Sequence, residues 1–172
     1  MNDRKWERYA ALGGVVWVLC AIIPGVASGQ SPATGDSADE IVKYLADNDT
    51  LFKLTFVLSL VGTLFLAWWF GSLWRRMSRA EGVQHRLAVV SLVGFTLSAA
   101  MALASQAIPA AVALRIHTDA ASTAPSMYVL STLLLAAAGF GAAVFLVATN
   151  ALALRTKMLP TWIVAVGLLS AQ

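Results

Sequence analysis

Charged residues are scarce in this chain of 172 residues, because Asp, Glu, Lys and Arg together make up only 12% of it. A soluble domain carries about twice that share and needs it to cover its core with a polar surface. Hydrophobic residues make up 59% of the sequence. The composition therefore predicts a protein whose outer surface faces lipid rather than water.

Residues that build disulfides, metal sites and haem sites are also nearly missing. The single cysteine, Cys20, lies in an apolar run, so the sequence has neither a disulfide framework nor a cysteine metal site. The two histidines, His85 and His117, lie between the apolar runs, where they could not ligate a haem iron inside a membrane. The sequence has no glycine-rich phosphate loop and no HExxH zinc motif. We therefore expect no catalytic residue, metal or cofactor, and a protein that is not an enzyme.

Long apolar runs are what the sequence has instead. About 20 helical residues are needed to cross about 30 Å of hydrocarbon, and four runs meet this requirement without a charged residue inside them. Within lipid such runs form helices, because the backbone must make its hydrogen bonds internally. The four predicted spans cover about residues 9–27, 54–74, 87–109 and 127–150.

Two runs near the chain ends need separate treatment. The first could be a cleaved signal peptide, but it exceeds the roughly 7–15 apolar residues of such a signal, which favours a retained helix. A fifth segment, residues 160–172, would reach only about 20 Å as a helix. A chain end inside lipid would leave carbonyl groups unpaired, so we expect a partial span of a truncated longer protein. The prediction is an all-α, polytopic membrane bundle in a single domain, residues 1–172.

The charges between the runs divide unequally between two sides. Nine basic and three acidic residues fall on one side, whereas three basic and six acidic residues fall on the other. The positive-inside rule places the more basic side in the cytoplasm, which predicts a multi-pass protein of the cell membrane with a cytoplasmic N-terminus. The basic residues of that side are Arg4, Lys5, Arg8, Arg75, Arg76, Arg79, Arg86, Arg155 and Lys157.

Four of these basic residues gather in one short segment between the second and third runs, namely Arg75, Arg76, Arg79 and Arg86. We interpret this segment as a cytoplasmic hairpin loop. Its arginines would fix the topology and contact anionic lipid headgroups, each contributing about 1 kcal/mol. Docking of an acidic cytoplasmic partner is the alternative. A nucleic-acid partner is not expected, because basic loops of membrane proteins report orientation.

The first external segment contains a predicted amphipathic helix over residues 38–47. Ser37 and Glu40 have the spacing of a capping box, and Ile41 and Leu45 fall on one helical face. This helix would lie on the outer membrane surface or across the mouth of the bundle. Its acidic residues could bind a cation, although their spacing fits no EF-hand loop and favours a solvated face.

The polar residues inside the runs are uncharged. Gln106 lies one turn before Pro109, which frees a backbone carbonyl nearby. A possible intramembrane polar pocket therefore comprises Gln106, Ser105, Ser98 and Thr63. The alternative is a structural role, in which these groups form hydrogen bonds within or between helices.

Small residues in the fourth run predict close helix packing. Ala137/Gly141 and Gly139/Ala143 are spaced four apart, a pattern that lets two backbones approach each other. The third run offers a matching pair, Gly94/Ser98. We expect the third and fourth helices to pack tightly as one hairpin.

Two stretches, "ADEIVKYLADND" and "LWRRMSRAEG", follow a basic N-terminal lead and a glycine-rich first helix. Together these features resemble a family of uncharacterised multispanning bacterial membrane proteins similar to domain of unknown function 4386. The resemblance covers about residues 5–155 and implies further spans beyond this chain. It implies no activity and no site.

The sequence thus predicts a non-enzymatic accessory or structural membrane bundle, in contact with the bilayer and its anionic lipids. It could form a homo-oligomer or bind another membrane protein through its small-residue faces. Two alternatives remain open. A small transporter or channel subunit would need a continuous polar lining, and a membrane enzyme acting on lipid would need a cleft with acidic residues.

Overall fold

The structure is a computed structural model that describes residues 3–27, 30–116 and 122–156. Every regular element within these ranges is a helix, as the predicted all-α fold requires. The predicted partial span over residues 160–172, with Lys157 before it, lies outside the described residues. The elements are α1 (Asp3–Ala27), α2 (Ala38–Asp47), α3 (Asp49–Glu81), the 3-10 helix η1 (Gly82–Gln84), α4 (Arg86–Arg115) and α5 (Ala124–Thr156).

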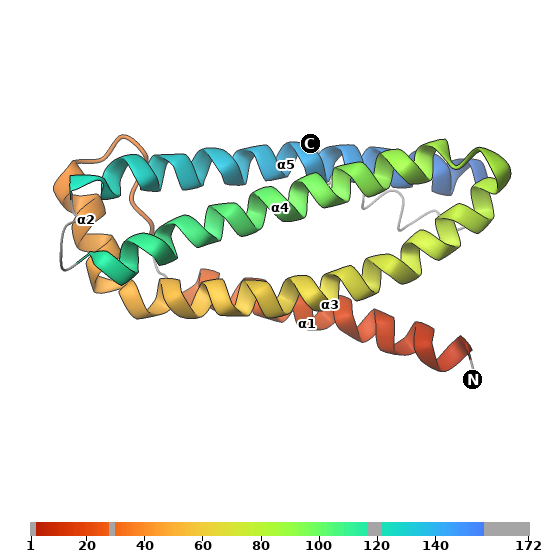
Figure 1. Ribbon diagram of the computed structural model, residues 1–172, viewed down its shortest axis with the longest axis horizontal. Helices are drawn as coiled ribbons and strands as arrows, with labels where there is room; N and C mark the ends of the chain where they lie inside the picture. The colour runs from red at the N-terminus through yellow and green to blue at the C-terminus, as the bar shows by residue number, and fades with distance from the viewer. Residues whose placement is uncertain (1–2, 28–29, 117–121, 157–172) are drawn as a thin grey trace.

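The four long helices form an elongated bundle, and α2 crosses one of its ends (Figure 1). The most extensive contact is between α4 and α5, which run side by side, while α3 packs on α4 and α1 packs on α3. The turn between α3 and α4 lies at the opposite end from α2 (Figure 1). We call these the α2 end and the turn end.

Each predicted span lies inside a helix, but the helices are longer than the apolar runs. α3, α4 and α5 contain 33, 30 and 33 residues, which corresponds to about 45–50 Å at 1.5 Å per residue. All three are long and apolar enough to cross a membrane, and α1 contributes the shorter apolar segment Leu12–Ile23. Because hydrocarbon spans about 30 Å, the ends of the long helices extend past any such layer.

The sequence predicted that the third span ends near Pro109. The helix that contains this span, α4, instead continues to Arg115. Proline lacks an amide hydrogen, so only the hydrogen bond to the carbonyl of Ser105, four residues earlier, is lost. The residues that follow are packed against other elements, with Val112 6% exposed and Ala113 1% exposed. This burial offsets the missing hydrogen bond and keeps the helix continuous.

The predicted helix over residues 38–47 is confirmed as α2, and so is its capping box. The Ser37 hydroxyl accepts from the Glu40 amide at 3.3 Å, and the Ser37 amide donates to the Glu40 carboxylate at 3.3 Å. Ile41 and Leu45 are buried in a cluster with residues of α4 and α5. Of the two predicted placements, the structure has α2 across the end of the bundle.

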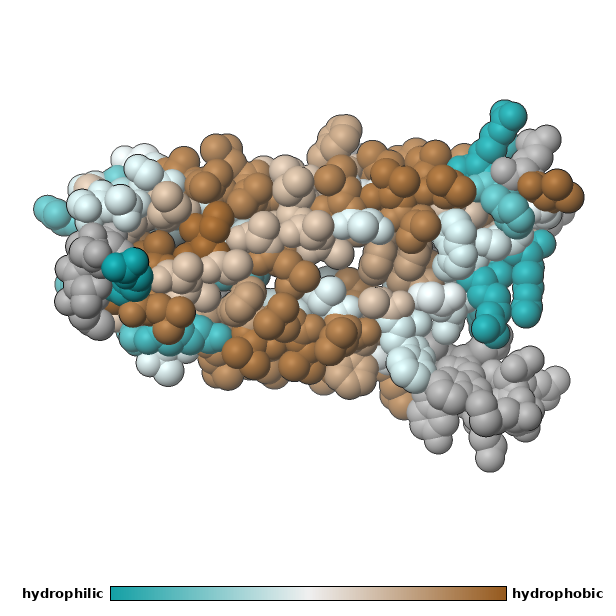
Figure 2. Space-filling model, viewed as in Figure 1, coloured by the Kyte–Doolittle hydropathy of each residue, from teal (hydrophilic) through white to brown (hydrophobic). Residues whose placement is uncertain are grey.

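Large apolar side chains cover the outside of the bundle between its two ends. Figure 2 shows a hydrophobic band along the middle and hydrophilic residues at the ends. Leu64 on α3 is 73% exposed and Phe140 on α5 is 70% exposed. Soluble proteins rarely expose apolar area on this scale, so the surface is compatible with a membrane protein.

Candidate functional site at the turn end

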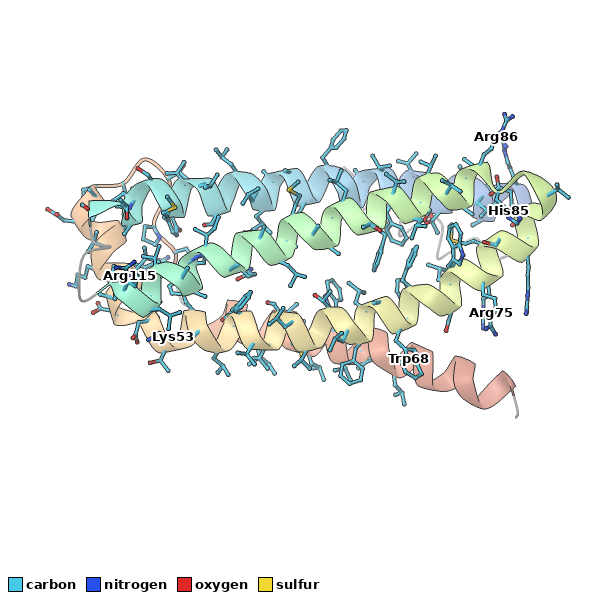
Figure 3. All side chains as sticks on the ribbon, in the orientation of Figure 1. Lys53, Trp68, Arg75, His85, Arg86 and Arg115 are labelled. Atoms are coloured by element: carbon cyan, nitrogen blue, oxygen red, sulfur yellow. The ribbon has the colours of Figure 1, made fainter. Side chains whose placement is uncertain are left out.

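None of the four clustered arginines lies in a loop. Arg75, Arg76 and Arg79 belong to the last turns of α3, and Arg86 is the first residue of α4. The predicted hairpin loop is therefore wrong for these arginines, because α3 continues in helical form to Glu81. Figure 3 shows Arg75, His85 and Arg86 at the turn end, and Lys53 and Arg115 at the opposite end.

The α3–α4 turn is short and contains two residues with positive φ. Gly82 has φ 73° and ψ −140°, and His85 has φ 44° and ψ 20°. The backbone conformation of Gly82 is open to glycine but not to residues with a Cβ. His85 lies in the left-handed helical region, which histidine adopts more often than most other non-glycine residues. The turn is thus encoded chiefly by Gly82.

Glu81, the last residue of α3, caps the N-terminus of α4. Its two carboxylate oxygens accept hydrogen bonds from the amides of Leu87, at 2.8 Å, and Ala88, at 2.9 Å. These amides lie in the first turn of α4, where amide groups have no partner within the helix. A negative charge at a helix N-terminus is also favourable because of the helix dipole.

The protonation of Glu81 follows from this cap. Residue 81 lies outside the predicted span 54–74. Burial of its carboxylate acts to raise its pKa, but the hydrogen bonds from Leu87 and Ala88, together with the nearby His85 imidazole, outweigh burial. The pKa of Glu81 therefore lies below its ordinary value, and the carboxylate holds the two helices together in its charged form.

Below the turn, a buried hydroxyl pair joins α4 to α5. Ser91 and Thr149 lie with their hydroxyl oxygens 2.9 Å apart, and Ser91 is fully buried. Met77, Ala88 and Leu152 form the adjacent core cluster and bring α3 into the same contact. Two polar atoms nearby, Ser78 Oγ and Asn150 Nδ2, are buried without a hydrogen-bond partner among the described residues.

Aromatic side chains pack α3 on α4 and α5 farther from the turn. Phe70 and Phe95 stack with ring centroids 4.0 Å apart and planes 5° apart, and both rings meet Phe145 edge-on at 5.9 Å. Beside this cluster an open apolar groove of about 280 Å³ runs between α3 and α4. We call it the α3–α4 groove, and its lining residues are Ala67, Phe70, Gly71, Trp74, Leu92 and Phe95.

The residues of the predicted polar pocket do not line this groove. Ser105 is buried and donates a hydrogen bond of 2.8 Å to the carbonyl of Ser131 on α5. Ser98 lies where α4 crosses α5, and its backbone approaches Gly141. Gln106 on α4 and Thr63 on α3 are half-buried. Ser105 thus has the structural role that the sequence left open as the alternative.

The α4–α5 crossing uses part of the predicted small-residue pattern. A Cβ on Gly94 would lie 2.6 Å from the amide nitrogen of Phe145, and one on Gly141 would lie 2.7 Å from that of Ser98. Gly139, by contrast, is exposed and has nothing within 4 Å of a built Cβ. Residues two apart differ by about 200° around a helix, so Gly139 and Gly141 cannot share one interface. Of the other pair members, Ala137 is exposed and Ala143 is half-buried.

Two features of this end were missed from the sequence. The cap by Glu81 has only a weak signal in the sequence, namely an acidic residue just before a helix break. The α3–α4 groove has no signal in the sequence, because it depends on which faces of α3 and α4 meet. Comparison of the chain with family models, curated proteins and solved structures finds no match.

Proposed function

We propose that this chain is a multi-pass protein of the cell membrane with four spans, α1, α3, α4 and α5, and a cytoplasmic N-terminus. In this proposal it acts as a non-enzymatic accessory or structural bundle that associates with lipid and with other membrane proteins. The exposed apolar band and the charged ends support the membrane location. The resemblance to domain of unknown function 4386 is retained as part of the proposal.

One observation carries the accessory role: the buried hydroxyl groups of Ser91, Thr149 and Ser105 form hydrogen bonds between helices. The Ser91–Thr149 pair and the Ser105–Ser131 hydrogen bond both join α4 to α5. Between them, Gly94 and Gly141 bring the two backbones into direct contact. A transport pathway, in contrast, is usually marked by ionisable groups that face the bundle interior or a hydrated cavity.

The orientation is supported by the charges at the two ends. Arg75, Arg79 and Arg86 at the turn end are exposed, and the positive-inside rule assigns such an end to the cytoplasm. The opposite end carries the acidic α2 segment, with Asp39, Glu40 and Asp47. In the proposed orientation, α2 lies outside the cell.

Cysteine labelling can test the orientation, because Cys20 is the single native cysteine. In a Cys20→Ser background, Val83→Cys places a thiol on a residue that is 97% exposed at the turn end. Thr34→Cys places one on an exposed residue near α2. On intact cells we expect a membrane-impermeant maleimide to label position 34 and not position 83. The reverse pattern would overturn the orientation, and a chain found in the soluble fraction would overturn the membrane location.

Labelling at Gln106 separates the accessory role from transport. A cysteine at this half-buried position of α4 should stay unreactive toward water-soluble thiol reagents from either side of a sealed vesicle. The exposed Val83→Cys variant, labelled after the vesicle is opened, serves as the positive control. Reaction at position 106 from one side would instead favour a small transporter or channel subunit.

A further inference from the structure

We propose that the α3–α4 groove binds one acyl chain of an anionic phospholipid of the cytoplasmic leaflet, with the lipid phosphate held by Arg75. This inference rests on the membrane location and orientation proposed above, and it assigns a specific partner and residues to the turn end. It requires an apolar slot of suitable size, a cation within one helical turn of the slot, and no better occupant.

The groove provides the apolar slot. Its six lining residues are aromatic, aliphatic or glycine, so no side chain in it offers a hydrogen bond to a polar ligand apart from the Trp74 indole. Its volume of about 280 Å³ is below the roughly 300–1,000 Å³ of pockets for drug-sized ligands. Ala67 and Trp74 are seven residues apart on α3, which gives the groove a length of about 10 Å along the helix. A narrow apolar slot of this length suits part of an acyl chain.

Gly71 gives the groove its width. It is exposed on α3, and a Cβ built on it would meet nothing within 4 Å. Glycine in the middle of a helix is unfavourable by about 1 kcal/mol relative to alanine, and here no neighbouring backbone requires it. The open space above Gly71 is therefore available to a ligand.

The cation lies one helical turn beyond the groove. Gly71, Arg75 and Arg79 follow one another at intervals of four on α3, so they lie along one side of the helix. Arg75 and Arg79 are exposed, and neither forms an ion pair with a described residue. Figure 3 shows Arg75 projecting away from the bundle at the turn end. An exposed arginine can bind a phosphate with two parallel hydrogen bonds.

A second copy of the chain is a poorer occupant than lipid. Stable interfaces bury about 800 Å² on each partner, far more than a groove with six lining residues can supply. Two copies with the same orientation in the membrane would also bring their arginines together at the turn end. Like charges repel, whereas an anionic lipid complements them.

The test uses brominated lipids, which quench tryptophan fluorescence on contact. The full chain is reconstituted into phosphatidylcholine nanodiscs that contain either brominated phosphatidylglycerol or brominated phosphatidylcholine at the same mole fraction. The contribution of Trp74 is the difference between the wild type and Trp74→Phe. We expect brominated phosphatidylglycerol to quench the fluorescence of Trp74 more strongly than brominated phosphatidylcholine does.

Two matched pairs of variants locate the site. Gly71→Leu fills the groove, whereas Gly139→Leu adds the same side chain to an equally open position on α5. Arg75→Gln removes the proposed phosphate ligand, whereas Arg86→Gln removes an exposed arginine of the same end. We expect Gly71→Leu to abolish the extra quenching and Arg75→Gln to reduce the lipid preference about fivefold, the effect of one basic residue near an anionic surface. Gly139→Leu should resemble the wild type, and Arg86→Gln should lower the lipid preference at Trp74 by less than Arg75→Gln does.

A second measurement covers the case in which Gly71→Leu moves Trp74 itself. The amount of phosphatidylglycerol that copurifies with the chain, counted by mass spectrometry, should fall in Gly71→Leu and not in Gly139→Leu. Equal quenching by the two lipids, or equal losses in Arg75→Gln and Arg86→Gln, would overturn the lipid site while the chain remains a membrane bundle. Failure of the wild type to enter nanodiscs would overturn the proposed function as well.

Discussion

Gly94 on α4 and Gly141 on α5 pack backbone to backbone, since a Cβ on Gly94 would lie 2.9 Å from the Gly141 carbonyl oxygen and one on Gly141 would lie 3.0 Å from the Gly94 carbonyl oxygen. The contact is reciprocal, and the rest of the helix pair is arranged around it. Ser91 and Thr149 pair on one side of the crossing, and Ser105 and Ser131 on the other.

Gly94→Ala is therefore expected to destabilise the bundle by about 1–3 kcal/mol, the usual range for overpacking. The new methyl group would meet backbone atoms of Phe145 and Gly141, which cannot move aside as a flexible side chain can. Thermal unfolding in detergent, followed by circular dichroism, measures the effect. Gly139→Ala is the control and should be neutral or stabilising, because that position is open and alanine favours helix. Equal stability of the two variants would contradict the crossing.

Ser91→Ala should weaken the α4–α5 contact by about 0.6–1.7 kcal/mol, the range found for hydrogen bonds between membrane helices. The loss arises because Thr149 would keep a buried hydroxyl without its partner. Replacing both residues, with Ser91→Ala and Thr149→Val, removes the unsatisfied group and should lower stability by less than the sum of the single changes. A double-mutant cycle of unfolding free energies checks this. Strict additivity would show that the two hydroxyls do not interact.

Glu81→Gln should destabilise the turn by about 1 kcal/mol at neutral pH, as loss of a helix cap usually does. A glutamine has one acceptor oxygen, so it cannot accept from both the Leu87 and Ala88 amides in the way the carboxylate does.

The difference in stability between the wild type and Glu81→Gln should depend on pH, and the direction of this dependence follows from the pKa of Glu81. The pKa of Glu81 is lower in the folded chain than its ordinary value of 4.5. Its stabilising contribution is thus complete above pH 4.5 and is lost as the pH falls through the lower folded pKa. Unfolding temperatures of the wild type and Glu81→Gln, measured from pH 7 down to pH 3, should converge at the acidic end. A difference that is constant over this range would contradict the role of the charge.

Tyr128→Phe should loosen the segment before α2 without unfolding the long helices. The Tyr128 hydroxyl donates a hydrogen bond of 2.8 Å to the carbonyl of Pro32, and such a bond contributes about 0.5–1.5 kcal/mol. Hydrogen exchange of residues 30–37 should accelerate in the variant. Tyr44→Phe removes the more exposed contact with Ser31, 3.1 Å long, and should have a smaller effect. Equal exchange rates in the wild type and Tyr128→Phe would contradict the proposed anchor.

Features that depend on neighbours in the sequence were predictable. The long helices follow from runs of apolar residues, and α2 follows from its capping box and the helical spacing of Ile41 and Leu45. The structural use of Ser105 was open from the sequence, because a hydroxyl in a membrane helix can bond to its own helix or to another. In the structure, the Ser105 hydroxyl donates its hydrogen bond to the carbonyl of Ser131 on the neighbouring helix.

Features that depend on contacts between helices were not predictable. The spacing of small residues favoured both Gly139 and Gly141, and only the angle at which α4 crosses α5 decides between them. The extent of α3 past its apolar run was also missed, because the arginines after Trp74 suggested a loop. Arginine is in fact a good helix former, and nothing stops the helix before Gly82.

The hydrogen bond between Tyr128 and Pro32 joins residues that are 96 positions apart, and this separation bears on the order of assembly during biosynthesis. Ile41 and Leu45 pack on Val112, Ile116 and Ala124, so α2 lacks most of its docking surface until α4 and the start of α5 have been synthesised. The α3–α4 hairpin, which is held by the local cap of Glu81, does not have to wait. The α2 end thus closes after this hairpin has formed, and the turn end is completed later still, because its core includes Thr149 and Leu152 near the end of α5.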